Sequence, residues 1–151
     1  MGHFAFRNIH IDATDIDEQE IFGKTIEKGV YPNDQLQRIS PEIFAKYFVP
    51  AEEEGYFRVI DTVRQSIHYK RHDLLSLKPI ASGFHLIMCK NVLLHFHPDE
   101  RRGVIKMFYS ALAPGGYFAT ERTQEMPEEL AHLFVQVSSE GQLYKKAGGA
   151  A

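Results

Sequence analysis

Long apolar runs, a strong excess of basic residues and paired cysteines are all absent from this sequence of 151 residues. Its apolar stretches are far shorter than the roughly 20 residues that a spanning helix needs, which argues against a membrane protein. Lysine and arginine number 17 against 20 aspartates and glutamates, so the net charge is −3. This balance argues against a general binder of nucleic acid or anionic membranes.

The single cysteine cannot form an internal disulfide. Cys89 lies in the apolar run 84–89, which favours a buried hydrophobic side chain over a nucleophile. The N-terminus lacks the charged-then-apolar pattern of a signal peptide, so we expect a cytoplasmic location. A G-x-S-x-G elbow and the spacing of structural zinc ligands are also missing, so we expect neither a serine hydrolase nor a metal site, although His95/His97 and His68/His72 have usable spacings.

Strand-like and helix-like segments alternate along the chain, which is typical of an α/β fold. With 44% apolar residues and no internal repeat, we expect one domain over residues 1–146 and a flexible tail over 147–151. Expected strands cover residues 8–14, 84–89 and 117–120, with a last edge strand at 142–144. Expected helices begin at a capping box formed by Asp17 and Glu20, at Ser40-Pro41, at Pro98 and near Pro127.

Residues 47–70 interrupt this alternation. Three consecutive glutamates followed by Gly55 indicate an exposed turn, and residues 63–70 alternate apolar with polar side chains. We therefore expect a small antiparallel β insertion over residues 47–70.

Polar residues follow three of the strand-like segments, namely Asp15, Asp73 and Asn91. Ligands of open α/β sheets bind beyond the carboxyl ends of the strands, and a carboxylate there accepts hydrogen bonds from both hydroxyls of a ribose. Asp15 fits that role, while a helix cap is the structural alternative. Three such ends together favour a nucleotide-like ligand.

Several short motifs occur in one order along the chain. They are Ala13-Thr14-Asp15-Ile16-Asp17, Gly29-Val30-Tyr31, Tyr47-Phe48, Asp73-Leu74-Leu75, Cys89-Lys90-Asn91-Val92-Leu93-Leu94-His95-Phe96 and Leu112-Ala113-Pro114-Gly115-Gly116. Together they resemble the catalytic domain of the CheR-type chemotaxis receptor methyltransferases. The resemblance covers residues 9–144 and implies a Rossmann-like class I methyltransferase sheet that uses S-adenosylmethionine and releases S-adenosylhomocysteine.

The resemblance also implies roles for individual residues. Asp15 corresponds to the acid that binds the ribose, and Asp73 and Leu74 to an Asn-Leu pair near the adenine. Asn91 matches an asparagine beside the cofactor. Lys90 stands where the family usually has arginine and His95 where it usually has tyrosine, so these two residues are the candidate catalytic residues. Gln124 stands where a glutamate is expected.

The family's catalytic domain begins with a strand, a small-residue loop and a helix, and no such unit precedes the strand of Asp15 here. The resemblance therefore implies a domain truncated at its N-terminal side, without the central strand between the strands at Ile9 and Phe84. Unpaired strand edges are unfavourable. We expect Phe4-Ala5-Phe6, another chain or a second copy in a homodimer to complete the sheet.

Two functions follow from these observations. The first is methyl transfer from S-adenosylmethionine to glutamate carboxylates of chemotaxis receptors. The alternative is a non-catalytic protein-interaction module in which the β insertion pairs with a receptor tail.

Overall fold

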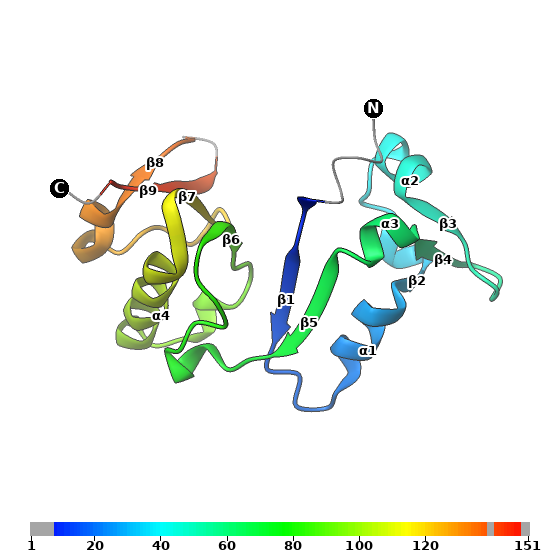
Figure 1. Cartoon of the computed structure of the whole chain (residues 1–151), viewed down its shortest axis with the longest axis horizontal. Helices are drawn as coiled ribbons and strands as arrows, with labels where there is room; N and C mark the ends of the chain where they lie inside the picture. Colours follow the sequence, from blue (N-terminus) through cyan, green and yellow to red (C-terminus); the bar gives the residue numbers. More distant parts are fainter. Residues whose placement is uncertain (1–7, 139–140, 149–151) are drawn as a thin grey trace. The chain divides into compact units, whose positions relative to one another are not determined.

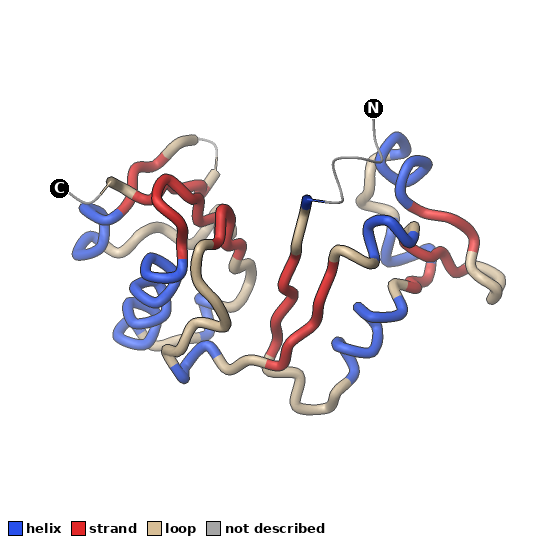
Figure 2. The backbone as a smooth tube through the Cα atoms, viewed as in Figure 1, coloured by secondary structure: helices blue, strands red, loops and turns tan. Residues whose placement is uncertain are grey.

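The computed structural model describes residues 8–138 and 141–148. The chain divides into two compact units, one ending at His72 and the other beginning at Asp73. Each unit is described by itself below, and Figures 1 and 2 show the helices and strands of both. None of the helices among the described residues is long and apolar enough to cross a membrane.

The first unit is built on two parallel strands and one helix. β1 (Ile11–Asp15) pairs with β5 (Ile67–Arg71), with Ile11 opposite Ile67 and Asp15 opposite Arg71. α1 (Ile21–Lys28) packs against β5, and Gly29 ends it in the left-handed conformation expected of a helix stop. β1 thus begins and ends slightly later than the expected strand 8–14.

The start of α1 differs from the expected capping box. Asp17 does cap the helix, because its carboxylate accepts hydrogen bonds from the backbone N–H groups of Ile21, Phe22 and Gly23 at 2.8–3.0 Å. Glu20 makes no side-chain cap and instead adopts a left-handed conformation. The capping-box prediction was therefore wrong for Glu20. Residues 17–20 form a turn, and the helix begins only at Ile21, the residue after Glu20.

A small antiparallel sheet forms the rest of this unit. β4 (Tyr56–Val59) lies between β2 (Val30–Pro32) and β3 (Phe48–Pro50). The 3₁₀ turn η2 (Asn33–Leu36) and α2 (Pro41–Tyr47) connect β2 to β3. α2 begins as expected at Ser40-Pro41, with the Ser40 hydroxyl accepting from the N–H of Ile43.

The insertion predicted over residues 47–70 was wrong at its end. Residues 61–64 form the short helix α3 (Asp61–Arg64), and the alternating residues that follow form β5. β5 pairs in parallel with β1 and is not part of the small sheet. Alternation of apolar and polar residues identifies a strand but not the strand with which it pairs. The third strand of the small sheet is β2, where β5 was expected.

The second unit contains a four-stranded sheet in the order β6-β7-β9-β8. β6 (Phe84–Met88) runs parallel to β7 (Leu112–Thr120). β9 (Gln142–Lys146) lies antiparallel between β7 and β8 (Phe134–Gln136). The expected edge strand at 142–144 is therefore internal, because the three-residue β8 takes the edge.

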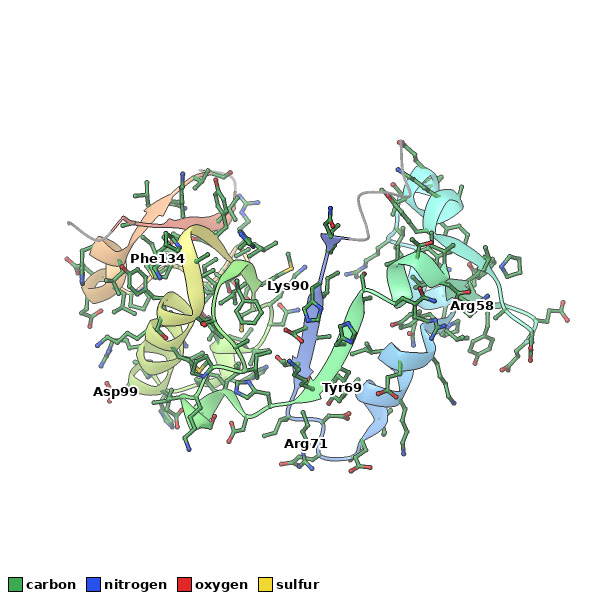
Figure 3. The ribbon with its side chains drawn as sticks, in the orientation of Figure 1. Arg58, Tyr69, Arg71, Lys90, Asp99 and Phe134 are labelled. Carbon is green, nitrogen blue, oxygen red and sulfur yellow. The ribbon has the colours of Figure 1, made fainter. Side chains whose placement is uncertain are left out.

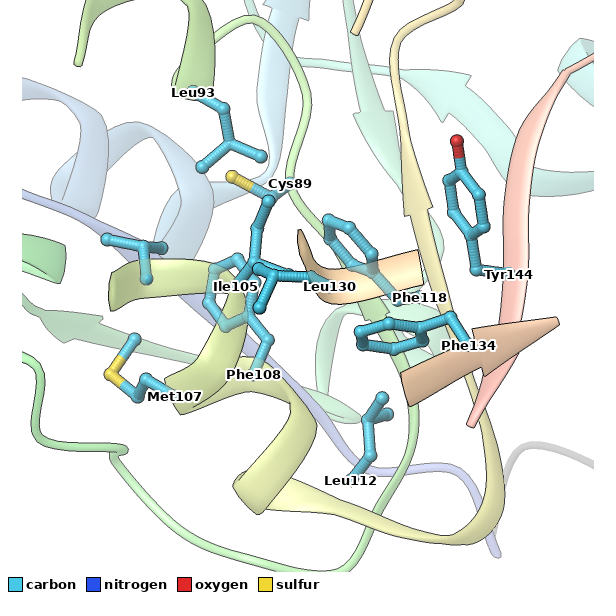
Figure 4. Close-up of a cluster of buried hydrophobic side chains, with 11 residues drawn as sticks. Cys89, Leu93, Ile105, Met107, Phe108, Leu112, Phe118, Leu130, Phe134 and Tyr144 are labelled. Carbon is cyan, nitrogen blue, oxygen red and sulfur yellow. The ribbon is translucent and has the colours of Figure 1, made fainter. Parts of the chain in front are cut away.

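One 14-residue helix, α4 (Pro98–Ala111), packs against β7 of this sheet. Pro98 opens it as expected, and the Glu100 carboxylate accepts the backbone N–H of His97 at 2.9 Å. Its buried residues Val104, Ile105 and Phe108 belong to the same hydrophobic cluster as Phe118. The rings of Phe108 and Phe118 lie 5.5 Å apart, and Figure 4 shows both within this cluster. Three short 3₁₀ turns complete the unit: η3 (Leu74–Ser76), η4 (Leu93–His95) and η5 (Glu128–Leu133).

Both parallel pairs keep a side without a partner among the described strands. β1 pairs only with β5, and β6 only with β7. Leu86 and Met88 of β6 are 52% and 68% exposed, and Ile11 of β1 is 42% exposed. The almost continuous apolar run of residues 84–89 predicts a strand that is covered on both faces, and this prediction is wrong for the described residues. The candidate filler Phe4-Ala5-Phe6 lies outside them.

Candidate functional site

Asp15 lies at the carboxyl end of β1, in the first unit, and its side chain is half-buried. Oδ1 accepts a hydrogen bond from the backbone N–H of Asp17 at 2.7 Å, which fixes the carboxylate in a tight turn. A carboxylate fixed at the carboxyl end of a strand stands where α/β sheets bind their ligands, so Asp15 is a candidate to bind a ribose hydroxyl.

Asp73 and Leu74 begin the second unit. The Asp73 carboxylate accepts the N–H of Leu75 at 2.9 Å and so caps η3. Leu74 is partly buried against the hydrophobic core. Leu74 therefore serves packing in addition to any contact with an adenine, whereas the exposed Asp73 remains available.

The carboxyl ends of β6 and β7 lie side by side. The ladder continues one residue beyond β6, where the backbone N–H of Cys89 donates to the carbonyl of Ala119 at 2.9 Å. Lys90 and Asn91 follow, both exposed, with Lys90 labelled in Figure 3. Asn91 has a positive φ of 59°, a conformation that asparagine tolerates better than most residues. Its side chain is thus presented at a sharp turn.

His95 is exposed at the end of η4, four residues after Asn91. The turn that carries it is braced from α4, because the Arg101 guanidinium donates to the carbonyls of Leu93 and Phe96 at 3.1 and 3.2 Å. Lys90, Asn91 and His95 therefore occupy one segment that is anchored at both ends. The exposed Lys90 and His95 are placed where a charged substrate group can reach them.

The sequence interpretation missed Glu121, the residue after β7. It is buried, and its Oε2 accepts hydrogen bonds from the backbone N–H of Asn91 at 2.9 Å and from the Thr120 hydroxyl at 2.8 Å. Gln124, where a glutamate was expected, is also buried and donates to the Glu125 carbonyl. The signal for Glu121 was the one used for Asp15 and Asn91, a polar residue directly after a strand.

Cys89 is buried as expected. Burial raises the pKa of its thiol to about 11, the Glu121 carboxylate acts in the same direction, and the N–H of Leu93 opposes them. The thiol is therefore protonated near neutral pH and unsuited to nucleophilic catalysis. Within residues 8–138 and 141–148, no group of three or more histidine, cysteine or carboxylate side chains is arranged to hold a metal ion.

The predicted site residues thus fall into two sets. Lys90, Asn91 and His95 lie together on one segment of the second unit. Asp73 and Leu74 begin the same unit, and Leu74 packs against its hydrophobic core. Asp15 belongs to the first unit and is described there by itself.

Comparison with known proteins gives a consistent family. The family model described as "CheR methyltransferase, SAM binding domain" matches residues 2–142. The chain is 32% identical over 111 residues to a chemotaxis protein methyltransferase of Vibrio parahaemolyticus, covering 73% of this chain and 39% of that protein. It is 27% identical over 136 residues to a probable chemotaxis protein methyltransferase of Rhizobium etli, covering 89% and 50%. The chain therefore spans half or less of the length of these relatives.

Among solved structures, the N-methyltransferase NodS of Bradyrhizobium japonicum in complex with S-adenosylhomocysteine matches with a TM-score of 0.48 and 15% identity, covering 91% of this chain and 66% of that one. The family model confirms the methyltransferase class expected from the sequence motifs, and the alternating helices and strands of the structure confirm the α/β class. The chain belongs to the CheR methyltransferase family, whose matched domain binds the cofactor S-adenosylmethionine.

Proposed function

We propose that this chain transfers the methyl group of S-adenosylmethionine to glutamate side chains of a protein, with chemotaxis receptors as the substrate class. The observation that carries the proposal is the match of the S-adenosylmethionine-binding domain over residues 2–142. The polar residues at three strand ends support it, because that is where α/β sheets bind ligands.

The chemistry is a direct displacement. The cofactor supplies a methyl group made electrophilic by the attached sulfonium. A glutamate carboxylate oxygen attacks this carbon, the carbon–sulfur bond breaks, and a methyl ester and S-adenosylhomocysteine form without net proton transfer. The protein contributes alignment and removal of water.

Each site residue has a role in this proposal. Asp15 binds the ribose, and Asp73, Leu74 and Asn91 hold the remainder of the nucleoside. Lys90 attracts and orients the substrate carboxylate by its charge, although it lacks the planar two-donor geometry of arginine. His95 donates a hydrogen bond to the same carboxylate.

The test of the cofactor site is calorimetric titration with S-adenosylhomocysteine. We expect micromolar binding by the unmodified chain and about tenfold weaker binding by Asp15→Asn. Asparagine keeps an acceptor for the N–H of Asp17, so the turn survives while the charge on the ribose side is lost. Glu18→Gln, an exposed carboxylate nearby, is the control and retains full affinity. No measurable heat with the unmodified chain would refute the proposal.

The small sheet is the proposed docking element for the protein substrate. β3 pairs with β4 on one side only, so its other edge offers backbone N–H and C=O groups to an extended peptide. Synthetic peptides from receptor tails should shift the backbone NMR signals of residues 48–50. Shifts confined to other residues would contradict this arrangement.

Another strand is the proposed partner of the free edges of β1 and β6, supplied by a further segment of polypeptide or by a second copy of the chain. The free edges of β1 and β6 among the described strands support this, because unpaired backbone groups along an edge favour pairing with another strand. Light scattering combined with hydrogen exchange tests it. A monomer whose β6 amides exchange without protection on the free edge would exclude a completed sheet.

A further inference from the structure

Glu121 is a charged side chain in an unusual position, directly after β7 and only 8% exposed. One oxygen of the side chain, Oε2, accepts hydrogen bonds from the backbone N–H of Asn91 and from the Thr120 hydroxyl. The other oxygen, Oε1, is enclosed and has no hydrogen-bond partner among the described residues.

The carboxylate is nevertheless kept ionised. Burial by itself raises the pKa of Glu121, but the N–H groups of Asn91 and of Glu121 itself, the Thr120 hydroxyl and the charge of Arg101 outweigh burial and lower it. Arg101 acts at a distance, since its guanidinium donates to the carbonyls of Leu93 and Phe96. The charge of the Glu121 carboxylate also raises the pKa of the buried Cys89 thiol.

A buried carboxylate with one unpartnered oxygen is a poor way to stabilise a core, because an unmade hydrogen bond there is unfavourable. Packing therefore does not explain why a charge stands at this position. The hydrogen bond to the Asn91 N–H offers an explanation, because it holds a residue whose backbone conformation is unfavourable.

The backbone of Asn91 leaves the regular strand conformation. The β6–β7 ladder ends with the N–H of Cys89, and two residues later Asn91 adopts a positive φ of 59°. Asparagine adopts this conformation more readily than most residues, but the conformation still costs free energy, which contacts with the surrounding structure offset. The Glu121 carboxylate accepts the N–H of this residue from the end of the neighbouring strand, so it fixes the backbone from which the Asn91 side chain extends.

We propose that Glu121 is a positioning residue of the cofactor site, which acts by holding Asn91 in its left-handed turn. The inference rests on the proposed function, because it takes Asn91 to contact the cofactor. In this proposal Glu121 does not contact the ligand, and it affects binding only by positioning Asn91.

The test combines four variants with titration by S-adenosylhomocysteine. Glu121→Gln keeps the shape of the side chain but removes the charge, and we expect about tenfold weaker binding. Thr120→Val is the matched control, because it removes the other hydrogen bond to the same oxygen while leaving Asn91 bound; we expect less than about a twofold change. In an Asn91→Ala background, Glu121→Gln should weaken binding no further.

The Asn91 amide signal in NMR spectra without ligand gives a second readout. A hydrogen bond to a carboxylate shifts this proton downfield. We expect the shift to be reduced in Glu121→Gln, whose neutral amide oxygen is a weaker acceptor, and retained in Thr120→Val. Unchanged affinity in Glu121→Gln, or a full additional loss in the Asn91→Ala background, would overturn the inference. Failure of the unmodified chain to bind would overturn the proposed function instead, and the amide shift would still decide whether Glu121 holds Asn91.

Discussion

The Tyr69 hydroxyl donates a hydrogen bond to Oδ2 of Asp17 at 2.9 Å, and this contact joins β5 to the start of α1. The same carboxylate caps α1 through three backbone N–H groups. Asp17 also donates its own N–H to Asp15. The candidate ribose-binding carboxylate is therefore held by a residue that simultaneously fixes the helix and the neighbouring strand.

This relationship predicts an acid-sensitive fold. Burial tends to raise the pKa of Asp17, but the N–H groups of Gly23, Phe22 and Ile21 and the Tyr69 hydroxyl together lower it. A lowered pKa means that the carboxylate stabilises the folded state fully above its usual pKa of about 3.9, and that this contribution disappears as the pH falls below that value. Asp17→Asn should lower Tm by about 5 °C at pH 7 and flatten the loss of stability between pH 4 and about pH 2.

Thermal unfolding followed by circular dichroism across this pH range measures both effects. Glu18→Gln is the control, because Glu18 is exposed beside the same turn. Equal pH dependence of Asp17→Asn and the unmodified chain would show that the carboxylate does not carry the effect.

Two helical glycines should respond oppositely to alanine. A Cβ on Gly23 of α1 would lie 2.5 Å from Cε1 of the Tyr69 ring, which cannot move without breaking its bond to Asp17. Gly23→Ala should therefore lower the free energy of unfolding by about 1–3 kcal/mol, despite the better helix propensity of alanine.

Gly103 of α4 provides the comparison. A Cβ there would lie 3.2 Å from Cδ2 of Leu77, an exposed and flexible side chain that can shift. Gly103→Ala should raise the free energy of unfolding by about 0.5–1 kcal/mol. Urea denaturation measures both variants, and a stabilised Gly23→Ala would contradict the packing of Tyr69 against α1.

The comparison of sequence with structure separates local from distant effects. Ser40-Pro41 and Pro98 marked helix starts correctly, because capping depends on residues within one turn. The partner of β5 could not be read from its alternation, since β1 lies far away in the sequence. β8 was missed because three residues are too few to show a period.

The candidate site shows the same division. Asp15, Asp73 and Asn91 were found because each follows a strand-like segment or directly caps a turn. The role of Glu121 depends on β6 and β7 being neighbours, which brings residues 91 and 121 together. Only the pairing of the strands reveals such a contact.

The exposed residues Lys90 and His95 allow a test of catalysis that leaves the fold intact. Both residues differ from those usual at these positions in the CheR family. Lys90→Arg and His95→Tyr together should therefore raise the rate of methyl transfer to glutamate severalfold. The main reason is that a guanidinium with two donors orients a carboxylate better than an ammonium group does. Tm should not change. Transfer of a labelled methyl group to a receptor fragment measures the rate.

Alanine at the same two positions provides the opposite test. Lys90→Ala with His95→Ala should reduce methyl transfer while leaving the affinity for S-adenosylhomocysteine within about twofold, since both residues are assigned to the substrate carboxylate. Equal losses of transfer and cofactor affinity would place these residues in the cofactor site instead.

Cys89 gives a probe of the second unit, because it is the single cysteine of the chain. With the pKa of its thiol raised to about 11 by burial, only about one thousandth is thiolate at pH 8. Reaction with Ellman's reagent should therefore be at least about 100-fold slower in the folded protein than in guanidinium chloride.

Opening of the core around Leu93 is then the step that limits labelling, since the side chains of Cys89 and Leu93 belong to one buried cluster. Leu93→Ala should speed the reaction by loosening this cluster, whereas Leu94→Ala, at an exposed neighbour, should not. Because the Glu121 carboxylate also raises the pKa of the thiol, Glu121→Gln should speed labelling to a smaller degree. Rapid labelling of the unmodified protein without denaturant would contradict the burial of Cys89, and with it the packing that holds the segment of Lys90 and Asn91 in place.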